Sequence, residues 1–189
     1  MKITVTDCGG TYRDVADAAR TTIHLEEGGK EVKESYMYRM YKSEHSPIRL
    51  REFKIVIDDC PYWVAMHFVR HHVGMTPFVS TQRTDRTGTD RTKLPQDAPV
   101  RLQMNANAQA MINMSRKRLC RCASEETRAI WRGVLEKLKE IDTPLYMCCV
   151  PECVYRGHCP EMWGCFFDKT ETYKVIREAY QEGWKEEQK

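Results

Sequence analysis

The sequence predicts an α+β fold: one domain over residues 1–189, with a small mixed or antiparallel sheet flanked by helices. Two short segments, 1–6 and 51–57, alternate between apolar and polar side chains, which is typical of half-buried strands. Residues 103–141 instead carry apolar side chains at helical spacing. A chain of 189 residues with 41% hydrophobic and 30% charged residues is long enough to bury a single core.

The segment between the two strands is expected to hold two short helices. Residues 13–22 and 36–42 carry helical patterns. Residues 24–35 between them are polar, and the Gly28-Gly29 pair marks a turn there.

A third helix is expected over about 60–72, directly after the second strand. Asp58 and Asp59 offer an N-cap, and Pro61 suits the first helical turn. Three side chains at i, i+4 and i+7 would share one face of this helix: Trp63, His67 and Arg70.

The chain after this helix is expected to be extended and then irregular. Residues 78–83 read as a short extended segment, and residues 84–97 as a long polar loop. Long polar loops inside small domains are more often functional or mobile than structural.

Residues 103–141 are expected to form two helices with a break near 122–124. Ser124 is the expected N-cap of the second helix, and Glu125 and Glu126 complement the positive end of its dipole. The residues expected to face the core along the second helix are Ile130, Val134, Leu135, Leu138 and Ile141.

The first of these helices, expected over 104–121, carries polar side chains on two faces. Asn107 and Arg118 would lie on one flank of a narrow apolar stripe. Roughly opposite would lie Gln109, Asn113, Arg116 and Cys120. Polar groups on two faces indicate a helix that is enclosed on several sides and either binds a polar ligand or crosses a subunit interface. A solvated helix with incidental amides explains the composition equally well, so both interpretations stay open.

Nine cysteines are the unusual count in the composition. Their odd number, and a first strand that reaches Asp7 at once and so is not typical of a secretory signal, indicate reduced thiols in a cytoplasmic protein. The spacing from Cys149 to Cys165 lacks the C-x2-C pairs of a zinc ribbon, so no metal ligands are predicted, although a structural metal stays open.

The chain is expected to end with a cysteine-rich loop over 148–165 and a last amphipathic helix over about 169–187. The apolar face of that helix would be formed by Tyr173, Ile176, Tyr180 and Trp184.

A net charge of +3 is too small to argue for wrapping nucleic acid. No run approaches the ~18 apolar residues that a membrane helix needs. Neither nucleic acid nor a membrane is therefore expected as a partner.

The spacing of Arg70-His71-His72, seven residues and then Ser80 resembles the R-H-R-x7-S signature of the flavin-dependent thymidylate synthases. Two further elements stand in that family's order. Glu44-His45-Ser46-Pro47 is similar to its H-E-[ST]-P element, and Arg91-x2-Leu94-Pro95 is similar to A-R-x-x-L-P.

Three more elements extend the resemblance over residues 44–165. Asn107-x-Gln109-x3-Asn113-x4-Arg118 is similar to the family's N-x-R-x3-N-x4-R helix, with Gln109 in place of an arginine. The run ASEETR, residues 123–128, is similar to A-Q-x-E-I-R, and residues 157–165 resemble the G-x-C-P-E…C ending of some members.

This resemblance implies a flavin-dependent thymidylate synthase-like fold and the reductive methylation of dUMP to dTMP. Methylene would come from methylenetetrahydrofolate and the hydride from reduced FAD, with NADPH as a further co-substrate. It also implies a homotetramer with active sites at subunit interfaces. No enzyme thiol attacks the pyrimidine in this family, so the cysteines are not candidate nucleophiles.

The resemblance also assigns roles to individual residues. Arg118 would hydrogen-bond the uracil edge and act as the main catalytic residue, because a guanidinium binds carbonyl pairs in its plane. The other residues expected to bind the nucleotide are His67, Ser80, Arg83 and, from a neighbouring subunit, Arg91. The residues expected around FAD are Ser46, Arg70, His71, His72, Asn107, Gln109 and Asn113.

The chain departs from the family's pattern around the nucleotide loop. His72 replaces an arginine, so a fixed charge becomes one that can titrate. Pro77 and Phe78 stand where the family carries Asn-Glu, and Arg49 stands where it carries a glutamate. Arg83 is displaced by one position, and the span from the signature serine to the A-R-x-x-L-P element is short.

Two other functions therefore stay open. One is FAD- and folate-dependent modification of another pyrimidine nucleotide. The other is a non-catalytic module that binds nucleotide, nucleic acid or metal through the basic run 116–121 and the cysteine-rich tail. Each signature residue also has a purely structural alternative, such as helix capping by His71 and His72.

Overall fold

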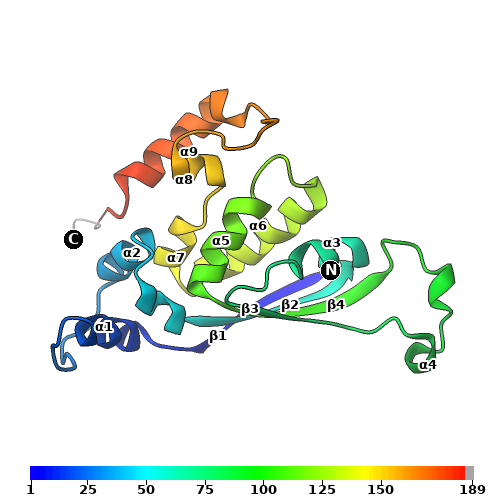
Figure 1. The fold of residues 1–189 in the computed structure, drawn as a ribbon, viewed down its shortest axis with the longest axis horizontal. Coiled ribbons are helices and arrows are strands. Elements are labelled where there is room, and N and C mark those ends of the chain that lie inside the picture. The colour runs from blue at the N-terminus through cyan, green and yellow to red at the C-terminus, as the bar shows by residue number, and fades with distance from the viewer. Residues whose placement is uncertain (186–189) are drawn as a thin grey trace.

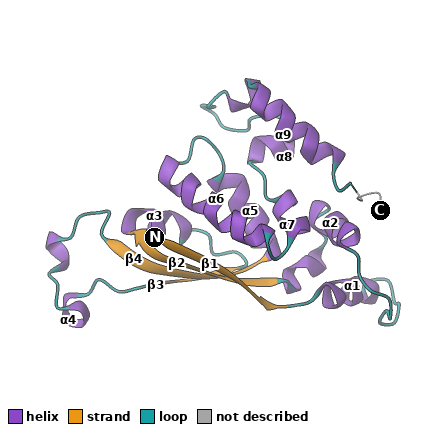
Figure 2. Ribbon diagram, turned by 180° about the vertical axis from the view of Figure 1, so that it is seen from behind, coloured by secondary structure: helices purple, strands orange, loops and turns teal. Residues whose placement is uncertain are grey.

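The computed structural model describes residues 1–185, and it places helices over one face of a four-stranded antiparallel sheet (Figure 1). The strand order is β1-β2-β4-β3, and every neighbouring pair is antiparallel. Figure 2 shows the same layering from behind. The predicted α+β class is confirmed, and the sheet is antiparallel rather than mixed. The strands are β1 (Lys2–Gly9), β2 (Glu52–Pro61), β3 (Met75–Val79) and β4 (Pro99–Asn107).

The helices of the described chain agree with the predicted order. Both predicted N-terminal helices are present, within two residues of their expected bounds. The α-helices are α1 (Tyr12–Thr21), α2 (Glu34–Lys42), α3 (Tyr62–Phe68), α4 (Thr84–Thr87), α5 (Ala108–Arg118), α6 (Glu125–Lys139), α7 (Thr143–Cys148), α8 (Glu152–Arg156) and α9 (Glu171–Glu182). Short 3-10 turns are η1 (Ser46–Leu50), η2 (Arg91–Lys93) and η3 (Phe167–Lys169). None of the helices within residues 1–185 has the length and apolar character needed to cross a membrane.

The prediction of a helix from residue 103 or 104 was wrong, because this stretch is the second half of strand β4. Its buried side chains alternate at a period of two: Val100, Leu102, Met104 and Ala106. The strand lies between β2 and β3, which satisfies its backbone on both edges. Asn107 is the N-cap of α5, and its side chain accepts a hydrogen bond from the Ala110 amide at 2.9 Å.

The predicted helix over 60–72 is shorter than expected. Strand β2 runs on to Pro61 through an irregularity between Ile57 and Cys60, so Asp58 and Asp59 are strand residues and not an N-cap. Helix α3 ends at Phe68 because the chain must turn back at Gly74 (φ +72°) to enter β3.

The extended segment predicted at 78–83 lies earlier, at Met75–Val79. The predicted polar loop over 84–97 contains the short helices α4 and η2, and it projects well beyond the end of the sheet in both ribbon views (Figures 1 and 2).

Helix α6 confirms the predicted N-cap. The Ser124 side chain accepts a hydrogen bond from the Thr127 amide at 3.4 Å. The predicted core residue Ile141 is 36% exposed because the helix ends before it. Trp131, which was not among the predicted core residues of this helix, is fully buried. The remaining predicted residues of the stripe are buried: Ile130, Val134, Leu135 and Leu138.

The C-terminal segment is more helical than predicted. Helix α8 interrupts the loop expected over 148–165, and α9 is shorter than the helix expected over 169–187, of which residues 186 and 187 lie outside the described part. Tyr173 and Tyr180 are buried as predicted, within a small second core that includes Phe167. Ile176, also expected on the apolar face, is 36% exposed. Trp184 lies after the helix and packs against the main core, beside Tyr38. One domain over the whole chain stays a prediction.

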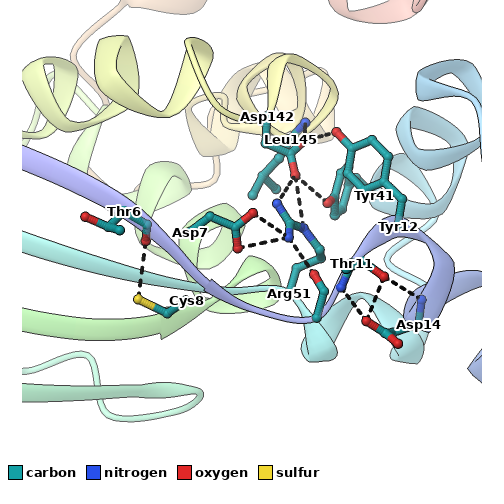
Figure 3. A network of polar contacts seen from close by, with 11 residues as sticks. Thr6, Asp7, Cys8, Thr11, Tyr12, Asp14, Tyr41, Arg51, Asp142 and Leu145 are labelled. Carbon is teal, nitrogen blue, oxygen red and sulfur yellow. Dashed lines mark hydrogen bonds and ion pairs between the residues drawn. The ribbon is translucent and has the colours of Figure 1, made fainter.

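A buried polar network joins the sheet to the helices (Figure 3). The Arg51 guanidinium pairs with Asp142 at 3.2 Å and with Asp7 at 2.9 Å. The hydroxyls of Tyr41 and Tyr12 donate to the Asp142 carboxylate at 2.8 and 3.0 Å. Arg51 and Asp142 are 4% and 1% exposed, so the Asp142 charge depends on Arg51 for compensation, while Arg51 also has the half-exposed Asp7.

We therefore expect Asp142→Ala to lower the free energy of unfolding by about 3 kcal/mol, the low end for breaking a buried ion pair. Arg51 keeps the half-exposed Asp7 as a partner, while the Tyr12 and Tyr41 hydroxyls lose their acceptor. Urea denaturation followed by circular dichroism measures the loss. Asp85→Ala is the control, since its ion pair with Arg83 lies at the surface. Equal losses in the two variants would contradict the proposed dependence on burial.

Candidate functional site

Arg118, the last residue of α5, contacts the end of α3 and the loop that follows it. Its Nε donates a hydrogen bond to Nε2 of His71 at 2.8 Å, and its Nη2 donates to the backbone carbonyl of His67 at 2.6 Å. The side chain is half-buried. These two contacts fix the plane of the guanidinium and leave its remaining donors available.

The electrostatics of this site favour an anionic ligand. Burial, followed by the nearby charges of Arg118 and His72, lowers the pKa of His71 to about 4. His71 is therefore neutral at pH 7, and its Nε2 can accept the hydrogen bond from Arg118. Burial and the charge of Arg70 lower the pKa of Arg118. Within residues 1–185, neither Arg70 nor Arg118 forms an ion pair with a carboxylate, so two positive charges lie together uncompensated.

His67 is positioned by the start of α6. Its Nδ1 lies 3.0 Å from the hydroxyl of Thr127, which also contacts the Ser124 hydroxyl at 2.7 Å. Burial and the charges of Arg118 and Arg70 lower the pKa of His67. Thr127 was not among the predicted site residues, although it belongs to the ASEETR element that carried part of the resemblance.

A second polar cluster lies on another face of α5. Gln109 donates to Glu44 at 2.6 Å, Arg116 forms an ion pair with the same carboxylate, and the Arg116 guanidinium stacks 3.6 Å above the Tyr155 ring. Asn113 accepts hydrogen bonds from Gln109 and Arg116, each at 3.3 Å. Burial acts to raise the pKa of Glu44, but the hydrogen bonds from Arg116 and Gln109 outweigh it and hold that pKa below its usual value.

Glu44 is the main site residue that sequence reasoning missed. It is the first residue of the E-H-S-P element, and it has a left-handed backbone (φ +51°), which is rare for residues other than glycine. Only its place at the start of that element could have indicated it. Ser46, predicted near FAD, lies two residues further on and is exposed at the start of η1.

A close backbone approach connects α5 to the histidine loop, residues 69–74 between α3 and β3. The Asn107 amide donates to the Gly74 carbonyl at 2.9 Å. A Cβ at Gly74 would lie 2.8 Å from the side-chain amide of Asn107, so only glycine fits there. His72 is exposed on the same loop, and its Nδ1 lies 3.1 Å from the Arg70 carbonyl.

Three of the residues predicted to bind the nucleotide, Ser80, Arg83 and Arg91, lie on the projecting arm, residues 80–98. Ser80 pairs with Arg101 through two hydrogen bonds of 2.9 Å, one of them accepted by its hydroxyl. Arg83 pairs with Asp85 at 2.8 Å, and Arg91 is exposed. No described hydrogen bond or ion pair connects these residues to Arg118, and both ribbon views show the arm extending away from α5 (Figures 1 and 2).

The position of Pro77 and Phe78 in an edge strand explains why the fold tolerates both residues. They lie in β3, the edge strand, where a proline has no second ladder to interrupt. Phe78 is 56% exposed, so the side chain that replaces the family's carboxylate faces solvent.

The structure favours the interpretation of α5 as an enclosed helix. Its buried residues spread over several faces, and both polar clusters contact other segments. Among the predicted site residues, the structure brings together His67, Arg70, His71 and Arg118. Gln109 and Asn113 lie in a separate cluster with Glu44.

No family model matches the chain, and no curated protein matches its sequence. Solved structures do match. The chain is similar to the UMP/dUMP methylase PolB from Streptomyces cacaoi bound with 5-Br dUMP, at a TM-score of 0.61 and 14% identity over 78% of this chain and 94% of that one.

It is also similar to the flavin-dependent thymidylate synthase ThyX from Helicobacter pylori complexed with FAD and dUMP. The TM-score is 0.63 at 13% identity, over 79% of this chain and 100% of that one. A further structure of the same protein with FAD and dUMP gives 0.63 at 11% identity, over 79% and 99% of the two chains. The chain therefore has a ThyX-like fold.

We expect Arg118→Ala to raise the pKa of His71 toward the ordinary histidine value, because the Arg118 charge is one cause of its depression. Titration of the histidine ring protons by NMR measures this pKa in both proteins. Lys117→Ala removes an exposed neighbouring charge and should leave His71 unchanged. A His71 that titrates near 6.5 in the unmodified protein would contradict the geometry described here.

Proposed function

We propose that this protein is a flavin-dependent methyltransferase that converts dUMP to dTMP with methylenetetrahydrofolate, FAD and NADPH. The observation that supports it most directly is the uncompensated guanidinium of Arg118, held in one plane by the neutral ring of His71 and the His67 carbonyl. The ThyX-like fold and the six sequence elements support it independently.

Arg118 would hydrogen-bond the uracil edge and stabilise the charge that develops there as C5 becomes nucleophilic. Its contact with His71 excludes rotation of the guanidinium, so little reorganisation is needed when the nucleotide binds. His67, fixed by Thr127, would present its other ring nitrogen to the nucleotide.

The residues around the histidine loop fit an anionic cofactor. Arg70 is exposed near Arg118 and has no carboxylate partner among the described residues, and the exposed His72 lies against the Arg70 carbonyl, which suits a pyrophosphate. When bound, reduced FAD would supply the hydride. Its remaining contacts would come from Ser46, His71, Asn107, Gln109 and Asn113.

The projecting arm supports an oligomeric site. No described hydrogen bond or ion pair joins Ser80, Arg83 or Arg91 to Arg118, and the arm extends away from α5, so a second chain that contributes one of the two groups would complete the site. We propose a homotetramer, likewise implied by the sequence resemblance, in which Arg91 reaches the Arg118 of a neighbouring subunit.

A second candidate function is the same reaction on a ribonucleotide such as UMP. Two observations favour it. Strand β3 carries Pro77 and Phe78 where the resembling family has Asn-Glu, and the fold is similar to that of a protein described as a UMP/dUMP methylase. The decisive experiment incubates purified protein with FAD, NADPH, methylenetetrahydrofolate and either dUMP or UMP. Methylated nucleotide from either substrate identifies the reaction. A colourless protein that binds no FAD and methylates neither would overturn it in favour of a non-catalytic module.

Arg118→Ala should leave a folded oligomer that binds FAD, while nucleotide binding weakens by about 1.5–3 kcal/mol, the range for hydrogen bonds to a charged group. Methyl transfer should fall further, because charge on the uracil develops mainly in the transition state. Isothermal titration with dUMP and single-turnover assays separate the two effects.

The matched control is Lys117→Ala, which removes the adjacent exposed cation and should affect both quantities little. Arg116→Ala is unsuitable, since it would leave the half-buried Glu44 carboxylate without its cation. Similar losses in Arg118→Ala and Lys117→Ala would mean that general basicity, not the placement of Arg118, supports binding.

Mixing Arg91→Ala and Arg118→Ala proteins should restore activity that neither has alone. With random exchange of subunits, about a quarter of the sites would receive both native arginines from adjacent chains. The measurement is methyl transfer after the mixed proteins are unfolded and refolded together. A mixture that stays as inactive as its components would contradict a site shared between subunits.

A further inference from the structure

The main core and the small second core leave a cavity of about 560 Å³ where they meet, here called the seam cavity. Leu135 of α6, with Tyr146 and Met147 of α7, lines it from the side of the main core. Phe167 of η3 and Tyr180 of α9 line it from the second core. Pockets for small molecules span roughly 300–1,000 Å³ and favour such junctions, so the seam cavity has the size and place of a ligand site.

The lining of the seam cavity is largely apolar and rich in aromatic rings. These rings belong to Tyr38, Tyr146, Phe167 and Tyr180. On α9, Val175 and Ile176 also line the cavity and are 65% and 36% exposed. A ligand with aromatic rings would cover this exposed apolar surface and make ring-to-ring contacts with the lining.

Two arginines add positive charge to the apolar lining. Arg121, in the turn after α5, and Arg132, in α6, both line the seam cavity and are exposed. Arg121 stacks 4.2 Å from the centre of the Phe167 ring, so its guanidinium lies against an aromatic side chain of the lining. Within the part of the chain that the structure describes, neither arginine belongs to an ion pair. Glu136 contributes one carboxylate against these two cations, which leaves a net charge of +1.

This combination of apolar rings and guanidinium groups selects one class of ligand. A neutral apolar molecule would gain from the rings but leave both guanidinium groups without an acceptor. A carboxylate matches the planar fork of an arginine through two parallel hydrogen bonds, and the charge strengthens both.

We propose that the seam cavity binds an aromatic carboxylate, with its rings among the aromatic side chains and its carboxylate on Arg132 and Arg121. This site is separate from the one proposed for nucleotide and FAD. Arg118 contacts His71 and the His67 carbonyl, and none of these three residues lines the seam cavity. Because the ligand would contact both α9 and the helices of the main core, its binding should raise the thermal stability of the full chain.

Isothermal titration of the full-length protein with biphenyl-4-carboxylate tests the proposal, with and without FAD and dUMP. We expect one site per chain with a dissociation constant of about 0.5 mM or lower, from the affinity that ligands gain per non-hydrogen atom. Biphenyl-4-carboxamide has nearly the same shape without the charge. It should bind about 10-fold more weakly, the lower end for a hydrogen bond to a charged group, since both arginines are exposed.

Variants of the charged lining residues should change the carboxylate affinity in opposite directions. Arg132→Gln should weaken carboxylate binding about 10-fold and leave carboxamide binding unchanged. Glu136→Gln removes a repelling charge and should strengthen carboxylate binding by about 3-fold. Arg49→Gln is the matched control, because it removes an exposed guanidinium in η1 that does not line the seam cavity.

Ala179→Trp tests the location without changing charge. Ala179 is an exposed residue of α9 that lines the seam cavity, so a large side chain there should fill part of it. Both compounds should then bind at least about 10-fold more weakly, while an unchanged melting temperature of the free variant shows that the fold is intact.

Several results would overturn the proposal. They are no binding of either compound, equal affinity for acid and amide, or unchanged carboxylate affinity in Arg132→Gln or Ala179→Trp. Loss of binding in the presence of FAD and dUMP would place the ligand in the nucleotide site instead. Tighter binding of dodecanoate than of biphenyl-4-carboxylate would contradict the aromatic class of ligand. Methyl transfer and FAD binding are measured separately, so failure here leaves the proposed function unaffected.

Discussion

The buried pairing of Arg51 with Asp142 is the interaction on which the arrangement of layers depends. Arg51 lies at the start of β2, and Asp142 is the N-cap of α7, ninety-one residues later. The hydroxyls of Tyr12 in α1 and Tyr41 in α2 donate hydrogen bonds to the same Asp142 carboxylate, which connects both helices to it. Because both charges are almost fully buried, losing any of these contacts leaves an uncompensated charge or polar group. The network therefore fixes where the helices lie over the sheet.

The candidate site is a consequence of that arrangement. Strands β2 and β4 are antiparallel neighbours, so α3 and α5, which follow them directly, begin at opposite ends of this strand pair. The end of α5 then reaches the loop after α3, where Arg118 contacts His71 and the His67 carbonyl. The start of α6 completes the site through Thr127. Side chains from three helical segments are thus held by rigid elements, which suits precise binding of a planar ligand.

Charge compensation distinguishes the two arginines near the end of α5. Arg116 has a carboxylate partner in Glu44 and the Tyr155 ring beneath it, so it holds α5 against the turn between α2 and η1 and against α8. Arg118 is half-buried, and its described partners are a neutral ring and a carbonyl. A cation placed this way is costly unless an anion or a polarisable carbonyl binds there. The two residues are close in sequence and similar in chemistry, yet their surroundings give them different roles.

The sequence by itself determined the α+β class, the strand 51–57, the Ser124 cap and the core stripe of α6. The reason is that the buried face of a strand or helix appears in the sequence as apolar residues at a regular spacing. Tertiary structure decided the rest. The stretch before Asn107 became a strand because β2 and β3 satisfy its backbone on both edges. Glu44 came to lie against α5, and Cys122 against Trp163 of the cysteine-rich tail, through contacts between segments far apart in the chain. Local periodicity records which face of an element is buried, but not which distant segment covers it.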